Sequence, residues 1–303
     1  MLCQFTFENF KSFKSEATLD LFAEPITEHE DSLIEDSSDG KKFLPVIVIY
    51  GPNGGGKTSV LEAFIYLSHK VLIPIVALKA SKSLQDEALE EGKTKEFKSF
   101  SLDEQEKYYL FDENCKELPI KFDVLFRIDD MEYKYQLYLL HASIVEENLY
   151  CRNLATNDPE VLFERNSSDF YIGDSLGDIR VGNIKASIPM LSHLAISYDI
   201  EIVDKIISWF LQCRILDYDN PFQDKRVVFL KDKEKEKLFL SMLAEMDINI
   251  TGIRTEEDSY GKITGVFITH CLEGGVCKEL PFEAESSGSR KLFGLLPFLL
   301  ECL

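Results

Sequence analysis

Val46-Ile-Val-Ile-Tyr50-Gly51-Pro-Asn-Gly-Gly-Gly56-Lys57-Thr58 is the stretch that decides the fold. Its first five residues form an apolar run rich in β-branched side chains, which is typical of a strand buried on both faces of a sheet. A glycine-rich turn follows, and residues 59–70 then carry apolar side chains at helical spacing. The sequence therefore predicts a buried strand, a tight loop and a helix in direct succession.

The loop fits the pattern G-x-x-x-x-G-K-[ST] of a phosphate-binding loop. Its glycines allow backbone N–H groups to approach phosphate oxygens, and the start of the helix directs its positive end at the same anion. We expect Lys57 to reach the β- and γ-phosphates of ATP and the Thr58 hydroxyl to ligate Mg²⁺. The predicted nucleotide-binding residues here are Gly51, Pro52, Asn53, Gly54, Gly55, Gly56, Lys57, Thr58 and Ser59. The alternative, a glycine-rich turn without a ligand, is disfavoured by the strand and helix patterns on either side.

Outward from the loop, residue patterns predict further elements. Alternation predicts strands at Leu2–Phe7 and Ala17–Phe22, joined by a turn at residues 8–13, and a hairpin over Lys121–Leu139. Apolar periodicity predicts helices over residues 188–216, 233–246 and 285–300, with a strand at 263–270. Residues 80–108 are rich in lysine and glutamate, which indicates a solvated insertion.

The composition is that of a globular protein. The chain has 303 residues, 45% of them hydrophobic, and a formal net charge of -20. This charge disfavours sequence-independent binding to nucleic acid or to an anionic membrane across the whole surface, although a local basic groove stays open. The seven cysteines include no C-x-x-C pair, so we expect free thiols in a reducing compartment.

The N-terminus has no basic region followed by an apolar run, so it does not resemble a signal peptide. The most apolar stretch, Val71–Leu78, is too short to span a bilayer and contains a proline. The sequence therefore predicts a cytoplasmic protein without a membrane partner.

A second candidate anion site lies near the end of the chain, at Glu285-Ser286-Ser287-Gly288-Ser289 followed by Leu292-Phe293. A serine and glycine turn that opens a helix binds anions by the same N-terminal physics as the phosphate loop. An ordinary N-capped helix is the alternative.

Together with the opening Phe7-Glu-Asn-Phe-Lys-Ser-Phe13, these motifs resemble the ABC-type ATPases of the SMC/RecF-like group. More closely, the chain resembles the bacterial AAA-family ATP-binding proteins of the abortive-infection and phage-defence type. The resemblance implies an α/β P-loop NTPase head with a mixed or parallel sheet, an antiparallel β subdomain and a helical lobe. It also implies that Ser286 and Gly288 form the ABC signature.

The same resemblance implies a mechanism. Two heads form a homodimer that sandwiches ATP and Mg²⁺, with Lys57 and Thr58 acting in cis and Ser286 and Gly288 acting in trans. Nucleotide binding and hydrolysis regulate a partner, such as a nuclease that acts as a defence effector. Lys11 and Ser12 approach the nucleotide from the N-terminal turn, or else belong to a surface turn.

Hydrolysis also needs the acidic pair of a Walker B strand, which in this family follows the signature helix. The sequence ends at Leu303 without such a strand, so a truncated head is expected. Asp129-Asp130 lies before the signature, where a solvated turn is the favoured interpretation. No Q-loop glutamine or switch histidine is identified, and the catalytic residues stay unknown.

The expected organisation is a single head over 1–303. It comprises a P-loop core (1–79), a charged insertion (80–117), an antiparallel β region (118–185) and a helical lobe with the signature (186–303). Three functions remain open: a hydrolysing ATPase whose missing residues are supplied, a non-catalytic ATP-binding switch or remnant, and another P-loop enzyme such as a kinase. No arginine-rich lid is identified in the sequence, which disfavours the third. No nuclease constellation of clustered carboxylates and lysine is identified either, so nuclease activity is expected to belong to a partner.

Overall fold

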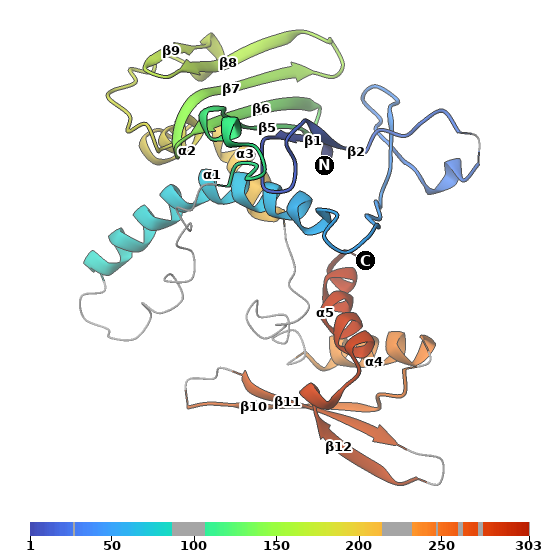
Figure 1. Cartoon of the computed structure of the whole chain (residues 1–303). Helices are drawn as coiled ribbons and strands as arrows, with labels where there is room; N and C mark the ends of the chain where they lie inside the picture. Colours follow the sequence, from blue (N-terminus) through green and yellow to red (C-terminus); the bar gives the residue numbers. More distant parts are fainter. Residues whose placement is uncertain are drawn as a thin grey trace. The chain divides into compact units, whose positions relative to one another are not determined.

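The computed structural model describes residues 1–26, 28–86, 107–213, 232–246, 248–259, 263–271 and 275–302. These residues form two compact units, Met1–Arg214 and Ile215–Leu303. Figure 1 colours the first unit from blue to yellow and the second in orange and red. Each unit has its own buried core, so each is described by itself.

The first unit is built on a seven-stranded sheet with the spatial order β2-β1-β5-β6-β7-β8-β9. The strands are β1 (Leu2–Glu8), β2 (Ala17–Asp20), β5 (Ile120–Ile128), β6 (Met131–Leu140), β7 (Ser143–Asn153), β8 (Pro159–Asn166) and β9 (Asp169–Ile172). The predicted hairpin is confirmed, because β5 pairs with β6 from Ile120↔Leu139 to Ile128↔Met131. The predicted mixed or parallel sheet is wrong for the described residues: every neighbouring pair in this sheet runs antiparallel.

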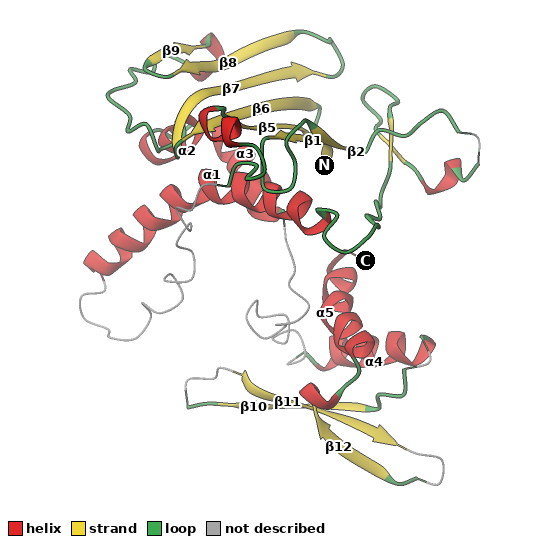
Figure 2. Ribbon diagram, in the orientation of Figure 1, coloured by secondary structure: helices red, strands yellow, loops and turns green. Residues whose placement is uncertain are grey.

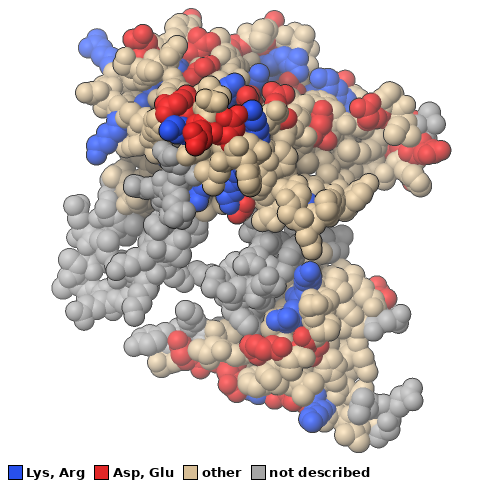
Figure 3. Space-filling view, viewed as in Figure 1, with Lys and Arg blue, Asp and Glu red and all other residues tan. Residues whose placement is uncertain are grey.

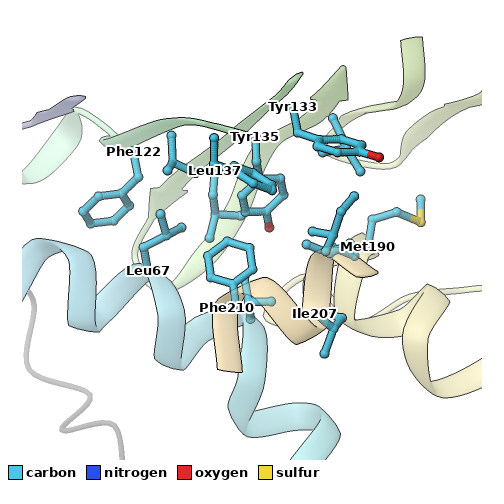
Figure 4. Packing of buried hydrophobic residues seen from close by; sticks show 14 of the residues in the cluster. Leu67, Phe122, Tyr133, Tyr135, Leu137, Met190, Ile207 and Phe210 are labelled. Carbon is cyan, nitrogen blue, oxygen red and sulfur yellow. The ribbon is translucent and has the colours of Figure 1, made fainter. Parts of the chain in front are cut away.

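Three helices cover one face of this sheet (Figures 1 and 2). They are α1 (Lys57–Asp86), α2 (Met190–Ser197) and α3 (Glu201–Gln212). Figure 4 shows side chains from the helices meeting side chains from the strands in a buried core. The labelled members are Leu67, Met190, Ile207 and Phe210 from the helices and Phe122, Tyr133, Tyr135 and Leu137 from the strands. Each fully buried side chain of this size stabilises the fold by about 1.5–3 kcal/mol.

Helix α1 begins directly after the glycine-rich loop, as predicted, but continues beyond the predicted end at Lys70. Ala63, Leu67, Val71 and Ile75 recur at helical spacing and are buried in the core. Among the described residues, the segment Lys57–Leu78 is long and apolar enough by length and composition to span a membrane. Its buried stripe also accounts for that composition, because a core helix of a soluble protein can be equally long and apolar.

The segment before the loop differs from its prediction. Val46–Tyr50 has no regular secondary structure, and the side chains of Val46, Val48 and Tyr50 are 71%, 75% and 89% exposed. The predicted strand, buried on both faces, is therefore wrong for this structure. A strand needs neighbours for its N–H and C=O groups, and no described residue forms a backbone hydrogen bond with these five.

In the sequence between β2 and the segment Val46–Tyr50, two short strands pair as a hairpin. They are β3 (Ile34–Glu35) and β4 (Lys42–Phe43). The 3-10 helix η1 (Glu30–Ser32) precedes this hairpin. Arg127 of β5 is 2% exposed and ties the hairpin to the large sheet. Its guanidinium bonds Asp36 at 2.9 Å, Asp39 at 2.7 Å and Glu132 at 2.9 Å. Because charge-assisted hydrogen bonds are the stronger class, Arg127 anchors the chain that leads into the glycine-rich loop.

This anchor makes stability depend on pH. The hydrogen bond from Arg127 holds the pKa of Asp39 below its ordinary value of 3.8. A carboxyl with a lowered folded-state pKa contributes stability that is complete above its unfolded pKa and is lost as the pH falls through the folded one. We therefore expect Asp39→Asn to lower the free energy of unfolding at pH 6, and to lower it less at pH 3. Urea unfolding at both pH values measures this, with the exposed Asp178→Asn as the control. An equal effect of Asp39→Asn at the two pH values would contradict the assignment.

Two further short helices lie in connections among the described residues of the first unit. The 3-10 helix η3 (Glu113–Glu117) precedes β5, and η4 (Asp174–Leu176) follows β9. Most of the predicted charged insertion, residues 87–106, lies outside the described residues. Asp129 and Asp130 form the turn between β5 and β6, and both are exposed. The prediction of a solvated turn there is confirmed.

The second unit packs two helices against a three-stranded sheet. The elements are α4 (Lys233–Glu245), β10 (Gly252–Glu257), β11 (Ile263–Cys271), β12 (Cys277–Pro281), the 3-10 helix η6 (Phe282–Ala284) and α5 (Ser287–Cys302). Phe239 of α4, Phe282 of η6 and Phe293 of α5 meet in its core, with ring centroids 5.2 Å and 4.8 Å apart in the two contacts to Phe293. The predicted helices at 233–246 and 285–300 and the strand at 263–270 are thereby confirmed.

The cysteines require a correction. Cys271 and Cys277, which were expected to be free thiols, form a disulfide between β11 and β12. Sequence separation did not reveal this pairing, because it depends on the register of the hairpin, in which the two residues lie opposite each other. Cys3, Cys115, Cys151 and Cys213 are free, as predicted.

Candidate nucleotide-binding site

The glycine-rich loop is an exposed turn that ends where α1 begins. Residues 51–55 and Thr58 are exposed, Gly56 and Lys57 are half-buried, and Ser59 is buried. Gly54 and Gly56 have φ values of 78° and 81°, a region that glycine enters without steric cost. A β-carbon at Gly56 would also lie 2.9 Å from the ring of Phe13, so the site has a second reason to require glycine.

Lys57 folds back over this loop. Its Nζ donates hydrogen bonds to the carbonyl oxygens of Gly51 at 3.0 Å and Pro52 at 2.7 Å. Within the loop itself, Gly55 N–H donates to Pro52 O at 3.2 Å. The ammonium group of Lys57, the first residue of α1, is thus held against the backbone of the turn. The N-terminal end of a helix carries partial positive charge.

The N-terminal turn forms a wall beside the loop. Ser12 Oγ lies 3.2 Å from Ser59 Oγ, and Lys11 Nζ lies 2.5 Å from Glu62 on the first turns of α1. Phe13 packs against Gly56 so closely that its ring leaves no room for a side chain there. The structure therefore brings Lys11 and Ser12 to the loop, as one of the two sequence interpretations expected.

Asn9 fixes the position of that turn, and sequence reasoning missed it. It is 3% exposed, has a φ of 54°, and its side-chain amide donates to the carbonyl oxygens of Cys115 at 2.8 Å and Leu118 at 2.9 Å. Its side-chain oxygen accepts from Tyr109 N–H at 3.1 Å. These partners are about 100 residues away along the chain, so no local pattern pointed to them.

The second predicted anion site is the N-terminus of α5. Ser286 caps this helix: its Oγ accepts from Ser289 N–H at 3.1 Å and lies 2.9 Å from Ser289 Oγ. Ser286 and Gly288 are exposed. Glu285, just before the cap, pairs with His270 of β11 at 2.6 Å. The predicted signature residues thus sit on a well-formed helix start in the second unit, while the loop belongs to the first.

The acidic residues that hydrolysis requires are not assembled at the described loop. Glu62, the carboxylate nearest in sequence, is paired with Lys11. Among the described residues, no group of three or more His, Cys, Asp and Glu side chains is arranged to hold a metal ion.

The loop nevertheless fits a nucleoside triphosphate. The Cβ positions of Gly51 and Gly54 face open space, which leaves room for phosphate oxygens close to the backbone there. Lys57 supplies a positive charge whose hydrogen-bond partners here are the neutral carbonyl oxygens of Gly51 and Pro52, and the Thr58 residue is exposed. The described loop thus presents groups suited to phosphate, while the carboxylate nearest to it in sequence, Glu62, is engaged by Lys11.

Comparison with known proteins agrees with this chemistry. The model of the family described as "AAA domain, putative AbiEii toxin, Type IV TA system" matches residues 46–303. The match begins at the apolar segment before the loop and includes the helix α5. No curated protein matches the chain. Because the family match covers more than half of the sequence, the chain belongs to this family of AAA-type P-loop ATPases.

Proposed function

We propose that the chain binds ATP together with Mg²⁺ at Gly51–Thr58 and uses the nucleotide to control its association with a second copy. The observation that carries the proposal is the position of Lys57 over the turn, at the N-terminal end of α1. A titration of the protein with MgATP, followed by calorimetry, tests the first step. Absence of saturable heat would remove its basis.

Each residue has a defined role in this proposal. Lys57 binds the β- and γ-phosphates, and the loop amides donate to phosphate oxygens. Thr58 would hold Mg²⁺, which would neutralise part of the phosphate charge. Lys11 and Ser12, held beside Ser59 and Glu62, line the same site from the N-terminal turn.

The proposed association uses the N-terminus of α5. Ser286 and Gly288 of one copy bind the γ-phosphate held by Lys57 of the other, as in the ABC-type heads that the chain resembles. The exposure of both residues at the positive end of α5 supports this role. The result is a homodimer that forms only when ATP is bound.

Ser286→Arg is expected to abolish ATP-dependent dimerisation without unfolding the protein. The larger side chain fills the space of the γ-phosphate and removes the cap on α5, which costs about 1 kcal/mol in stability. Size-exclusion chromatography with multi-angle light scattering, with and without MgATP, measures the dimer. Ser241→Arg, on α4 of the same unit, is the matched control and should dimerise like the wild type. Normal dimerisation of Ser286→Arg would disprove the trans role.

We further propose that this ATP-dependent step regulates a partner, such as a nuclease that acts as an effector in phage defence. The family description, which names a toxin of a toxin–antitoxin system, supports this context. On the face drawn in Figure 3, acidic side chains are interspersed with basic ones over the described residues, which gives no support for direct nucleic-acid binding.

A non-catalytic ATP-binding switch is the second candidate. It is favoured by the pairing of Glu62 with Lys11 beside the loop, and by the finding that no group of three or more His, Cys, Asp and Glu side chains among the described residues is arranged to hold a metal ion. Steady-state ATPase measurement separates the two functions. Turnover that depends on Lys57 supports a hydrolysing ATPase, whereas saturable binding without turnover supports the switch.

A further inference from the structure

A disulfide joins two strands of the second unit, and the proposed function does not use it. Cys271 ends β11 and Cys277 begins β12, and the two residues are direct cross-strand partners with Cα atoms 4.0 Å apart. The bond therefore cross-links the hairpin at the end where the chain passes from β11 to β12.

The other cysteines whose side chains are described are poor candidates for thiol chemistry. Cys3, Cys115 and Cys151 are buried, and Cys213 is half-buried. Burial raises the pKa of Cys3 to about 12 and the pKa values of Cys151 and Cys213 to about 11. Because the thiolate is the reactive form, these three side chains stay unreactive near neutral pH.

The disulfide, by contrast, is accessible. Cys277 and its neighbours Val276 and Lys278 are exposed, and Val276 is 65% exposed. A small thiol can therefore approach the sulfur of Cys277 from solvent. In a reducing cytoplasm, where the sequence predicts this protein to reside, disulfides are typically transient or redox-sensing.

The hairpin is connected directly to the start of α5. His270, the residue before Cys271, lies 2.6 Å from Glu285, which precedes the cap Ser286. From Cys277, β12 continues through η6, where Phe282 packs on Phe293 of α5. Both strands that the disulfide joins therefore hold the segment in which α5 begins.

We propose that Cys271–Cys277 is a reversible thiol–disulfide modification site whose state sets the order of residues 277–290. A thiolate of a dithiol reductant attacks the sulfur of Cys277, the S–S bond breaks, and Cys271 leaves as a thiolate that takes up a proton. The second thiol of the reductant then attacks the mixed disulfide, and Cys277 leaves. Two cysteine thiols and the oxidised cyclic disulfide of the reductant result. Glutathione disulfide reverses the change and is itself reduced to two glutathione molecules.

The physical consequence is a looser hairpin. A cross-link lowers the number of conformations open to the strands it joins, so its loss favours local opening. The strand pairing nearest to the bond opens first. It consists of the pairs His270↔Lys278 and Thr269↔Glu279. The contact between His270 and Glu285 weakens with them, and the first turn of α5 becomes less protected.

Hydrogen–deuterium exchange on the full chain tests this proposal. After treatment with dithiothreitol, amides of residues 277–280 and 285–290 should exchange at least about tenfold faster than after treatment with glutathione disulfide. Amides of β5 and β6 should not change. Intact mass should show the gain of two hydrogens on reduction and their loss on reoxidation.

Variants separate the switch from a general loss of stability. Cys271→Ser combined with Cys277→Ser should match the reduced wild type under both treatments, while Cys115→Ser, a buried cysteine in the other unit, should keep the wild-type response. If the wild type exchanged equally in both redox states, the proposal would be overturned. The same holds if glutathione disulfide failed to form the bond. Neither readout involves ATP, so the result does not depend on the proposed function.

Discussion

Replacing Lys57 with alanine is expected to lower the affinity for MgATP by about 100-fold, which corresponds to the loss of one or two charge-assisted hydrogen bonds to phosphate. In the structure the ammonium group is bonded to the carbonyl oxygens of Gly51 and Pro52, and no carboxylate of the described residues pairs with it. Its exchange of these neutral partners for phosphate oxygens therefore breaks no ion pair. Calorimetric titration of wild type and variant with MgATP measures the difference.

Lys134→Ala is the matched control for this experiment. Lys134 is exposed on β6, and its replacement removes the same charge from the surface of the same unit. The affinity of this variant for MgATP should equal that of the wild type, because a distant surface charge is screened by salt. Equal affinities of all three proteins would mean that the loop does not bind the triphosphate through Lys57.

Local patterns predicted what depends on local spacing. The loop, the start of α1 at Lys57, the β5–β6 hairpin and the cap at Ser286 each follow from a few consecutive residues. Turn chemistry placed Asp129 in a tight turn, where its φ of 51° is compatible with aspartate.

Val46–Tyr50 shows where such patterns fail. The composition of this segment is that of a buried strand, and it precedes the loop as expected. Whether a strand forms there depends on neighbours that lie elsewhere in the sequence, and no described residue pairs with its backbone. An apolar pattern shows that a segment is suited to a buried position. It does not show that the fold supplies the neighbours that would bury it.

Contacts between distant residues were also beyond sequence reasoning. Arg127 meets Asp36 and Asp39 about 90 residues away, and Asn9 meets carbonyl groups more than 100 residues away. The disulfide could be predicted only from the register of β11 against β12. In each case the side chain alone is compatible with many partners, and the topology selects one.

Glu147 makes the most deeply buried of these long-range contacts. It lies on β7, is fully buried, and accepts hydrogen bonds from the N–H groups of Met190 at 2.6 Å and Leu191 at 3.0 Å and from the hydroxyl of Tyr135 at 3.0 Å. The guanidinium of Arg165, 1% exposed, lies 3.5 Å away. One carboxylate thus joins the sheet to the start of α2 and balances a buried positive charge.

Glu147→Ala is expected to lower the free energy of unfolding by about 3–5 kcal/mol, because it leaves Arg165 charged and unbalanced in the core and frees two amides at the start of α2. Domains of this kind are stable by about 5–15 kcal/mol, so the variant should be close to the limit of folding at 37 °C. Urea unfolding followed by circular dichroism measures the change in midpoint. Glu164→Ala, which removes an exposed carboxylate that accepts a hydrogen bond from Tyr150, should cost less than about 1 kcal/mol. Similar losses of stability for both variants would show that the buried Glu147 contributes no more to the free energy of unfolding than an exposed carboxylate. The hydrogen bonds that Glu147 accepts would then not be what holds α2 to the sheet.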